Sequence, residues 1–334
     1  MKGDIVKIME NLKLTVSSTP HVRENNSIED IMLDVILALM PAAFAGVYFF
    51  GARALAVMLV SVISCVGFEA LYEKIAHKKV TVNDFSAVVT GMLLAYVLPP
   101  SIPYFMVIIG AFVAIVITKQ LFGGLGQNFM NPALIGRAFL MASFPVAMTT
   151  FTTSRMGILE KSVDAVTGAT VLSKEYQGAA PTLFEAFIGK NGGGTMGGCI
   201  GETCAAALLI GFVYLIIRRV ITLHIPLSYL GTMVVMALLF GETNPLMSIF
   251  TGGVMLGAIF MATDYVTTPT TPVGQIIFGI GCGLLTSVIR FWGGYPEGVT
   301  YAILLMNVIT PLLDKWTAPK AFGAVKSSSE KGLN

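Results

Sequence analysis

The chain has 334 residues, of which 55% are hydrophobic and only 12% are charged, with a formal net charge of +2 at pH 7. Soluble domains carry about twice this charged fraction, so the composition excludes an ordinary soluble domain and predicts an integral membrane protein. The basic residues are scattered rather than gathered on one stripe, which argues against a nucleic-acid surface.

The chain opens with a polar segment, residues 1–30, that lacks the charged start and apolar core of a signal peptide, so we expect no cleaved signal peptide. Ten apolar runs follow, and each predicts a transmembrane helix. Several are near the lower length limit for spanning, which indicates helices that are tilted, broken or packed deep in the bundle. The runs lie near residues 34–50, 54–71, 85–99, 103–119, 132–147, 201–217, 225–241, 246–263, 273–289 and 298–314.

A long polar loop, residues 148–200, separates five runs from five. An odd number of spans in each half makes the halves antiparallel, as in inverted repeats. The sequence therefore predicts an all-α membrane protein with about ten transmembrane helices in two inverted five-helix repeats. Its parts would be the cytoplasmic segment 1–30, the first repeat 31–147, the outer loop 148–200, the second repeat 201–316 and a cytoplasmic tail 317–334.

The distribution of Lys and Arg predicts the orientation, because cytoplasmic loops are enriched in both. With the N-terminus inside, fourteen of the 21 Lys and Arg fall on the cytoplasmic side, Lys119 among them. The short outer loops then hold only Arg53 and Arg290. We expect a multi-pass protein of the cell membrane with both termini in the cytoplasm and the 148–200 loop outside.

Three dipeptides, Asn131-Pro132, Asn244-Pro245 and Thr271-Pro272, predict helix starts, because the first side chain caps free N–H groups and proline suits the first turn. They mark either ordinary loops or half-helices whose N-terminal dipoles face a ligand. The Gly-rich turn 123–128 before Asn131 favours half-helices, since its bare N–H groups suit an anion or an electron-rich ring.

Four acidic residues lie in or beside apolar runs. An ionised carboxylate at mid-bilayer costs about 2.5–3.5 kcal/mol of insertion free energy, so its presence there indicates a function. We take Asp84, Glu202 and Asp264 as candidates for ion passage, whereas Glu69 precedes a basic loop and is expected to reach water. The His and Cys residues show no ligand spacing, so no metal site is expected.

The stretch from Asp164 to Leu172 reads DAVTGATVL. By itself it could be a turn of small residues in the outer loop. It resembles the D-x-x-[ST]-G-A-T-x-[LVI] signature at which flavin transferases attach FMN through a phosphodiester. That resemblance implies that Thr170 is the acceptor and that Asp164 serves recognition by the transferase. Thr167 stands where the signature often has Ser.

Further motifs resemble the NqrB/RnfD family, and the length, without an extended N-terminal portion, resembles its RnfD members. They cover nearly the whole membrane portion in the family order. One departure is Tyr265, which follows Ala-Thr-Asp264 in place of Pro. The matching segments are 84–87, 90–91, 98–100, 122–128, 131–137, 201–203, 262–264 and 293–298.

The resemblance implies a role in an Rnf complex, which passes electrons between reduced ferredoxin and NAD and couples this to Na⁺ or H⁺ translocation. It implies covalent FMN on the outer side and a non-covalent riboflavin near the cytoplasmic side, in contact with Asn128 and Asn131. Arg137 or Arg290 would pair with acids or with flavin phosphate. The implied partners are the other Rnf subunits (C, G, E, A and B), a flavin transferase and membrane lipid.

Three alternatives stay open. Inverted repeats and midplane acids also suit a secondary transporter or channel, although a flavin acceptor loop does not. An NqrB-like component of a Na⁺-pumping NADH:quinone reductase would work with quinone, and a purely structural scaffold would carry no flavin. No NAD-binding fingerprint is present, so NAD is expected to bind another subunit.

We predict that Thr170→Ala abolishes covalent flavin, because the matched hydroxyl is lost. In-gel fluorescence of the denatured protein, co-expressed with a flavin transferase, measures it. Thr167→Ala is the matched control and should keep at least part of the fluorescence. A Thr170→Ala band as bright as that of the unmodified chain would contradict the assignment.

Overall fold

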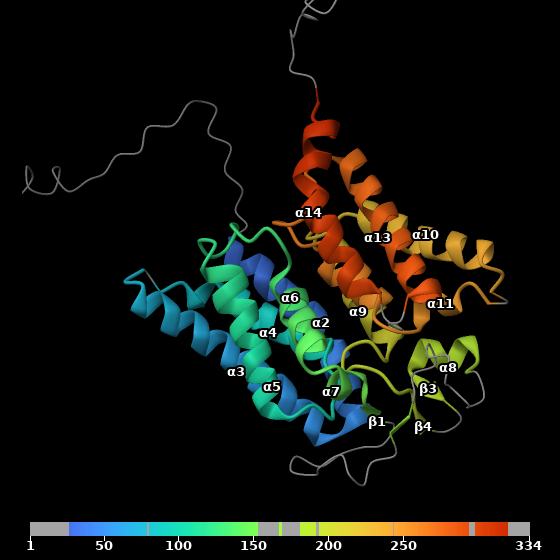
Figure 1. The fold of residues 1–334 in the computed structure, drawn as a ribbon, viewed down its shortest axis with the longest axis horizontal. Helices are drawn as coiled ribbons and strands as arrows, with labels where there is room; N and C mark the ends of the chain where they lie inside the picture. Colours follow the sequence, from blue (N-terminus) through green and yellow to red (C-terminus); the bar gives the residue numbers. More distant parts are fainter. Residues whose placement is uncertain are drawn as a thin grey trace, which may run out of the picture.

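The computed structural model describes residues 27–78, 80–152, 167–168, 181–191, 194–242, 244–293 and 298–319. Within these ranges nearly all regular structure is helical (Figure 1). Two short antiparallel ribbons are the exceptions: β1 (Phe151–Thr152) with β2 (Thr167–Gly168), and β3 (Lys190–Asn191) with β4 (Gly194–Thr195). The chain is therefore an all-α membrane protein, as predicted.

Each apolar run of the first half forms a helix. The helix α2 begins in a capping box, in which Ser27 and Asp30 satisfy each other's backbone N–H groups. Asn131 caps α6, and Pro132 occupies its first turn, as the Asn-Pro pair predicted. The elements are α2 (Ile28–Phe50), α3 (Ala52–Ile75), η1 (Val82–Asp84), α4 (Ser86–Tyr96), α5 (Tyr104–Phe112), its continuation as the π-helix η2 (Val113–Gln120), and α6 (Pro132–Ser143).

The second half has the same order of helices, but its eighth apolar run is also interrupted. Thr271-Pro272 starts α13 as predicted. The prediction for Asn244-Pro245 is wrong, because α11 begins only at Met247, after a turn. Two short helices lie between the halves: α7 (Pro145–Thr149), which ends the fifth apolar run, and α8 (Leu183–Ile188) in the long loop. The elements of the second half are α9 (Ala205–Ile217), α10 (His224–Leu239), α11 (Met247–Phe250), α12 (Val254–Leu256) with its π-helical continuation η4 (Gly257–Met261), α13 (Pro272–Trp292) and α14 (Val299–Thr317).

Among the described residues, α2, α3 and α13 are long and apolar enough to cross a membrane by themselves. The other apolar runs form shorter or interrupted helices, such as α4 with 11 residues. The fifth run breaks at Phe144 and the eighth at residues 251–253. The lengths of the runs had indicated such broken helices.

The two halves pack in matching patterns and run in opposite directions. In the first half α3 packs on α4 and α5; in the second, α10 packs on α11, η4 and α13. The first helices of the halves, α2 and α9, lie side by side and antiparallel. Asp34 near the start of α2 bonds Arg218 just after α9, whereas Gly46 near the end of α2 lies against Ile200 just before α9. This geometry confirms the inverted arrangement.

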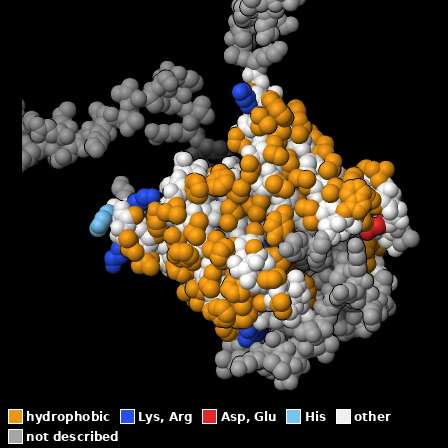
Figure 2. All heavy atoms as spheres, in the orientation of Figure 1, with side chains coloured by type: hydrophobic (Ala, Val, Ile, Leu, Met, Phe, Trp, Pro, Cys, Tyr) orange, Lys and Arg blue, Asp and Glu red, His pale blue; other side chains and the backbone are white. Residues whose placement is uncertain are grey.

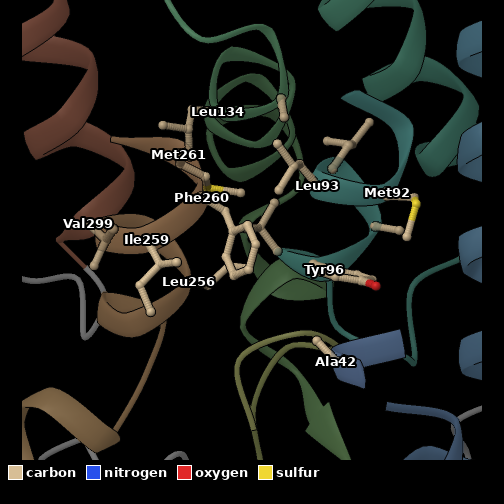
Figure 3. Packing of buried hydrophobic residues seen from close by; sticks show 14 of the residues in the cluster. Ala42, Met92, Leu93, Tyr96, Leu134, Leu256, Ile259, Phe260, Met261 and Val299 are labelled. Atoms are coloured by element: carbon tan, nitrogen blue, oxygen red, sulfur yellow. The ribbon is translucent and has the colours of Figure 1, made fainter. Parts of the chain in front are cut away.

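A central seam joins the halves, formed by α4 from one and α12–η4 from the other. Most of α4 and all of residues 254–262 are buried. Figure 3 shows Phe260 and Leu256 of the second half facing Leu93 and Tyr96 of the first. The short helices are therefore shielded from lipid, where their free ends could not be satisfied.

The outer surface is apolar over most of the face in Figure 2, with charged side chains near its edges. The long helices present exposed side chains such as Phe44 and Leu59. Two exposed tryptophans, Trp292 at the end of α13 and Trp316 in the last turn of α14, suit the two membrane–water interfaces.

We predict that Gly211→Ala destabilises the junction of the halves, because a Cβ at Gly211 would overlap the carbonyl oxygen of Ala38. Overpacking of this kind costs about 1–3 kcal/mol. Gly231→Ala is the matched control, since a Cβ at this helical glycine meets nothing within 4 Å. Thermal unfolding in detergent should show a lower midpoint for Gly211→Ala alone; equal midpoints would contradict the packing argument.

Candidate functional site

A pocket with about 800 Å³ of empty space opens between the halves, at the end of the bundle where α2 begins and α9 ends. We call this the N-terminal end of the bundle. Its walls are mainly apolar and come from both halves, with polar residues clustered on the segments before α4 and α6 and after η4. The lining includes Ile31, Val35, Ser86, Leu93, Lys119, Leu125, Asn128, Asn131, Leu215, Ile259, Phe260, Asp264 and Tyr265.

Two predicted residues, Asn128 and Asn131, lie together in this pocket. They follow a turn in which Gly123 and Gly124 have φ angles of +127° and +101°, which favour glycine. Asn128 donates through Nδ2 to the Met130 carbonyl oxygen at 3.0 Å, and its Oδ1 accepts no bond from the residues the structure describes. That oxygen is a free acceptor at the pocket wall.

The carboxamide of Asn131 is engaged within the protein. Its Oδ1 accepts from the backbone N–H groups of Ala133 at 3.1 Å and Leu134 at 3.4 Å, which is the cap of α6. Its Nδ2 donates to the carbonyl oxygen of Met261, at the end of η4, at 3.3 Å. Asn131 therefore ties the two halves together beneath the pocket and supports its wall.

Asp264 is the third predicted residue at this pocket. It follows η4, and its two oxygens accept from the Val266 backbone N–H at 3.5 Å and the Thr267 hydroxyl at 3.2 Å. The neighbouring Tyr265, the departure from the family pattern, donates its hydroxyl to the carbonyl oxygen of Val220. That bond joins the segment after η4 to the segment after α9 at the rim of the pocket.

Asp84 lies just beside the pocket. Its Oδ1 accepts from the Ser86 backbone N–H at 2.8 Å and from the Ser86 hydroxyl at 2.5 Å, and Ser86 lines the pocket. The carboxylate thus stands at the N-terminus of α4, where it complements the positive end of the helix dipole.

The expectation that Glu69 reaches water is wrong. Glu69 is 0% exposed, and its Oε1 accepts from Lys119 Nζ at 2.5 Å and from Gln120 Nε2 at 2.8 Å. Lys119, assigned from the sequence to the cytoplasmic side, is itself only 2% exposed. Both donors lie at the end of the π-helix η2, a geometry often found at functional positions.

Glu202 lies at the opposite end of the bundle, before α9. It is buried, and its Oε1 accepts from the Cys199 backbone N–H at 2.8 Å. The same loop bonds to the end of α4 through Ile200 N to Leu98 O at 3.1 Å and Gly201 N to Tyr96 O at 3.0 Å. Glu202 therefore lies on the seam but not in the pocket, so the predicted acids do not form one cluster.

Arg290, expected to pair with an acid or with flavin phosphate, has backbone partners among the bonds described. It donates to the carbonyl oxygens of Ser248 at 2.6 Å and Thr251 at 3.1 Å, which ties α13 to α11. Arg137 is buried within α6. No group of three or more potential metal ligands is found among the residues that the structure covers.

Asp164 and Thr170 lie outside the described residues. Of the same signature, Thr167 and Gly168 form β2, whose backbone pairs with β1 directly after α7. Thr167 and Gly168 therefore lie beside the end of the fifth apolar run, at the end of the bundle opposite the pocket.

Sequence reasoning missed Ser86 and Lys119 as pocket residues. Lys119 was assigned to the cytoplasmic side because it closes an apolar run. Glu69 in the second apolar run and Lys119 in the fourth were a usable signal, because intramembrane charges are usually paired. The spacing of the apolar residues in the sequence could not show that η2 is a π-helix.

A family model described as NQR2, RnfD, RnfE family matches residues 15–323. The chain is 49% identical over 322 residues to the D subunit of the Na(+)-translocating ferredoxin:NAD(+) oxidoreductase complex of Acetobacterium woodii, covering 96% of this chain and 99% of that protein. It is 47% identical over 329 residues to the D subunit of the proton-translocating ferredoxin:NAD(+) oxidoreductase complex of Clostridium ljungdahlii, covering 95% and 98%. The D subunit of an ion-translocating oxidoreductase complex of Ectopseudomonas mendocina is 36% identical over 331 residues, covering 93% and 96%.

Proposed function

The chain belongs to the NQR2, RnfD, RnfE family, and we propose that it is the D subunit of an ion-translocating ferredoxin:NAD⁺ oxidoreductase complex. The observation that carries this proposal is the match to the D subunit from Acetobacterium woodii at 49% identity over 96% of the chain. The match runs through both halves of the bundle, so it covers the pocket, the seam and the outer segments together.

Electron acceptor chemistry separates this role from its main alternative, an NqrB-like component of an NADH:quinone reductase. Membranes that contain the complex should reduce NAD⁺ with reduced ferredoxin, and deletion of this chain should abolish that activity. Quinone reduction by NADH without any ferredoxin-dependent activity would favour the alternative. Two relatives of nearly equal identity are named for different ions, Na⁺ and the proton, so both uptakes should be measured.

The chemistry of the pocket lining suits a riboflavin. Its mainly apolar walls suit a flat ring. The free Oδ1 of Asn128 can accept from the ring edge or the ribityl hydroxyls. The N-termini of α4 and α6 both point their positive dipole ends to this region, which favours an electron-rich ring. The bound ring would supply the electron chemistry, while these residues bind and orient it.

Thr170 is the proposed attachment point of FMN, supported by the signature from Asp164 to Leu172. A flavin transferase is then required for maturation. The signature and the pocket lie at opposite ends of the bundle, so the chain would hold one flavin near each side of the membrane.

The placement in the cell membrane, with both termini in the cytoplasm, rests on the Lys and Arg distribution. It puts the pocket on the cytoplasmic side and the 148–200 loop outside. Exposed apolar faces on α2 and α3 would meet lipid or the other subunits of the complex (C, G, E, A and B).

Ion passage is assigned to Asp264, Glu202 and Asp84. Asp264 and Asp84 stand at the pocket end of the seam and Glu202 at the other, which suits entry and exit positions on one route between the halves. Hard oxygen ligands can replace the water of a migrating cation.

Replacement of Asn128 and Asn131 by Leu is expected to release riboflavin while covalent FMN stays, because the free acceptor of Asn128 and the Asn131 bonds that support the pocket wall are lost. Flavin extraction followed by chromatography measures both pools. Asn131→Asp is the control for the helix start, since it keeps the cap, which is worth about 1 kcal/mol. Unchanged riboflavin content in the double Leu variant would remove the pocket from consideration as the riboflavin site.

Asp264→Asn and Glu202→Gln should lower ion uptake by proteoliposomes of the whole complex while FMN content stays normal, because each keeps shape but loses charge. Asp314→Asn is the matched control: this acid bonds Thr270 on the loop after Asp264 and does not line the pocket. Full ion uptake per transferred electron in both test variants would show that these acids are structural.

A further inference from the structure

A buried lysine lines the pocket, and the function proposed above does not use it. Lys119 is 2% exposed, yet it belongs to the pocket wall together with Ser86. Burial of an ammonium group within a membrane bundle is costly unless the group is paired and hydrogen-bonded. The described contacts of Lys119 meet that condition only in part.

The ammonium of Lys119 has three N–H donors, and the described structure accounts for two of them. One donates to Glu69 Oε1 at 2.5 Å and one to the Ser86 hydroxyl oxygen at 2.6 Å. Ser86 in turn donates to Asp84 Oδ1, which holds the hydroxyl in place. The third N–H has no acceptor among the residues that the structure describes.

The ion pair is oriented with respect to the pocket. Lys119 is a lining residue, whereas its partner Glu69 is fully buried behind it, between α3 and η2, and does not line the pocket. Gln120, the next residue of η2, also donates to Glu69 Oε1, so the carboxylate is held on the far side of the lysine. Of the two charges, the positive one is therefore nearer to any bound ligand.

We propose that Lys119 is a ligand-facing cation that donates a hydrogen bond to an acceptor atom of a flavin-type ring and favours the reduced, more electron-rich form of that ring. Glu69 is the positioning residue that holds the lysine in place. This inference rests on the proposal that the pocket binds riboflavin, and it adds a residue that sets the relative affinity for the two redox forms.

The test uses the full chain in lipid nanodiscs, expressed without a flavin transferase so that no covalent FMN absorbs. Dissociation constants are measured for oxidised riboflavin and, under anaerobic conditions, for riboflavin reduced with dithionite. Lys119→Met should weaken binding of the reduced form about tenfold more than that of the oxidised form, because a charge interaction within a protein is stronger than the same interaction in bulk water. A tenfold change in this ratio equals a potential lower by about 30 mV for a two-electron couple.

Two further variants separate an effect of Lys119 on the bound ring from an effect on folding. Arg53→Met is the matched control: it removes a buried cation that donates to the Pro100 and Ile102 carbonyl oxygens at the opposite end of the bundle, does not touch the pocket, and should leave the ratio unchanged. Lys119→Met combined with Glu69→Leu removes both charges, because Lys119→Met alone leaves a buried carboxylate unpaired and can impair folding. A folded double variant with the ratio of the unmodified chain would overturn the role of Lys119. If the unmodified chain binds neither form, the riboflavin assignment of the pocket is itself overturned.

Discussion

The structure depends on how the ends of two short buried helices are hydrogen-bonded. A bilayer offers no water to a helix end, so a helix can stop at membrane depth only where protein groups replace that water. At the end of α4, the carbonyl oxygens of Tyr96 and Leu98 accept from Gly201 and Ile200 of the second half. At the end of η4, the carbonyl oxygen of Met261 accepts from Asn131 of the first half. Each half thus completes the broken helix of the other, which fixes the seam and the pocket beside it.

Close approach of backbones holds neighbouring helices of the bundle together. Glycines stand where helices cross: Gly91 of α4 lies against α3, and Gly211 of α9 lies against α2. Hydroxyl groups add bonds at similar crossings, such as Ser61 to the Gly91 carbonyl oxygen at 2.7 Å and Tyr229 to Thr286 at 2.6 Å. Small residues and interhelical hydrogen bonds are the usual means of association where the hydrophobic effect cannot drive it. The same means act in both halves, in keeping with their inverted relation.

The buried acidic side chains have different kinds of partner among the described residues. Glu69 is paired with a buried lysine, Asp34 with the half-exposed Arg218, and Glu202 with a backbone N–H. Relatives with 49% and 47% identity carry names with different coupling ions. Since both align over almost the whole chain, the fold that they share is compatible with either named ion.

The sequence by itself determined the class, the ten apolar runs, the division into two halves and the helix starts at Asn131 and Thr271, because these depend on composition and on local backbone chemistry. It also indicated three residues that the fold brings to one pocket: Asn128, Asn131 and Asp264. The tertiary structure alone decided the rest. The turn at Asn244-Pro245 did not start a helix, Glu69 and Lys119 met inside the bundle, and Glu202 stood apart from Asp264. The reason is that burial and pairing arise between segments far apart in the chain, whereas caps and apolar runs lie within a few turns of one helix.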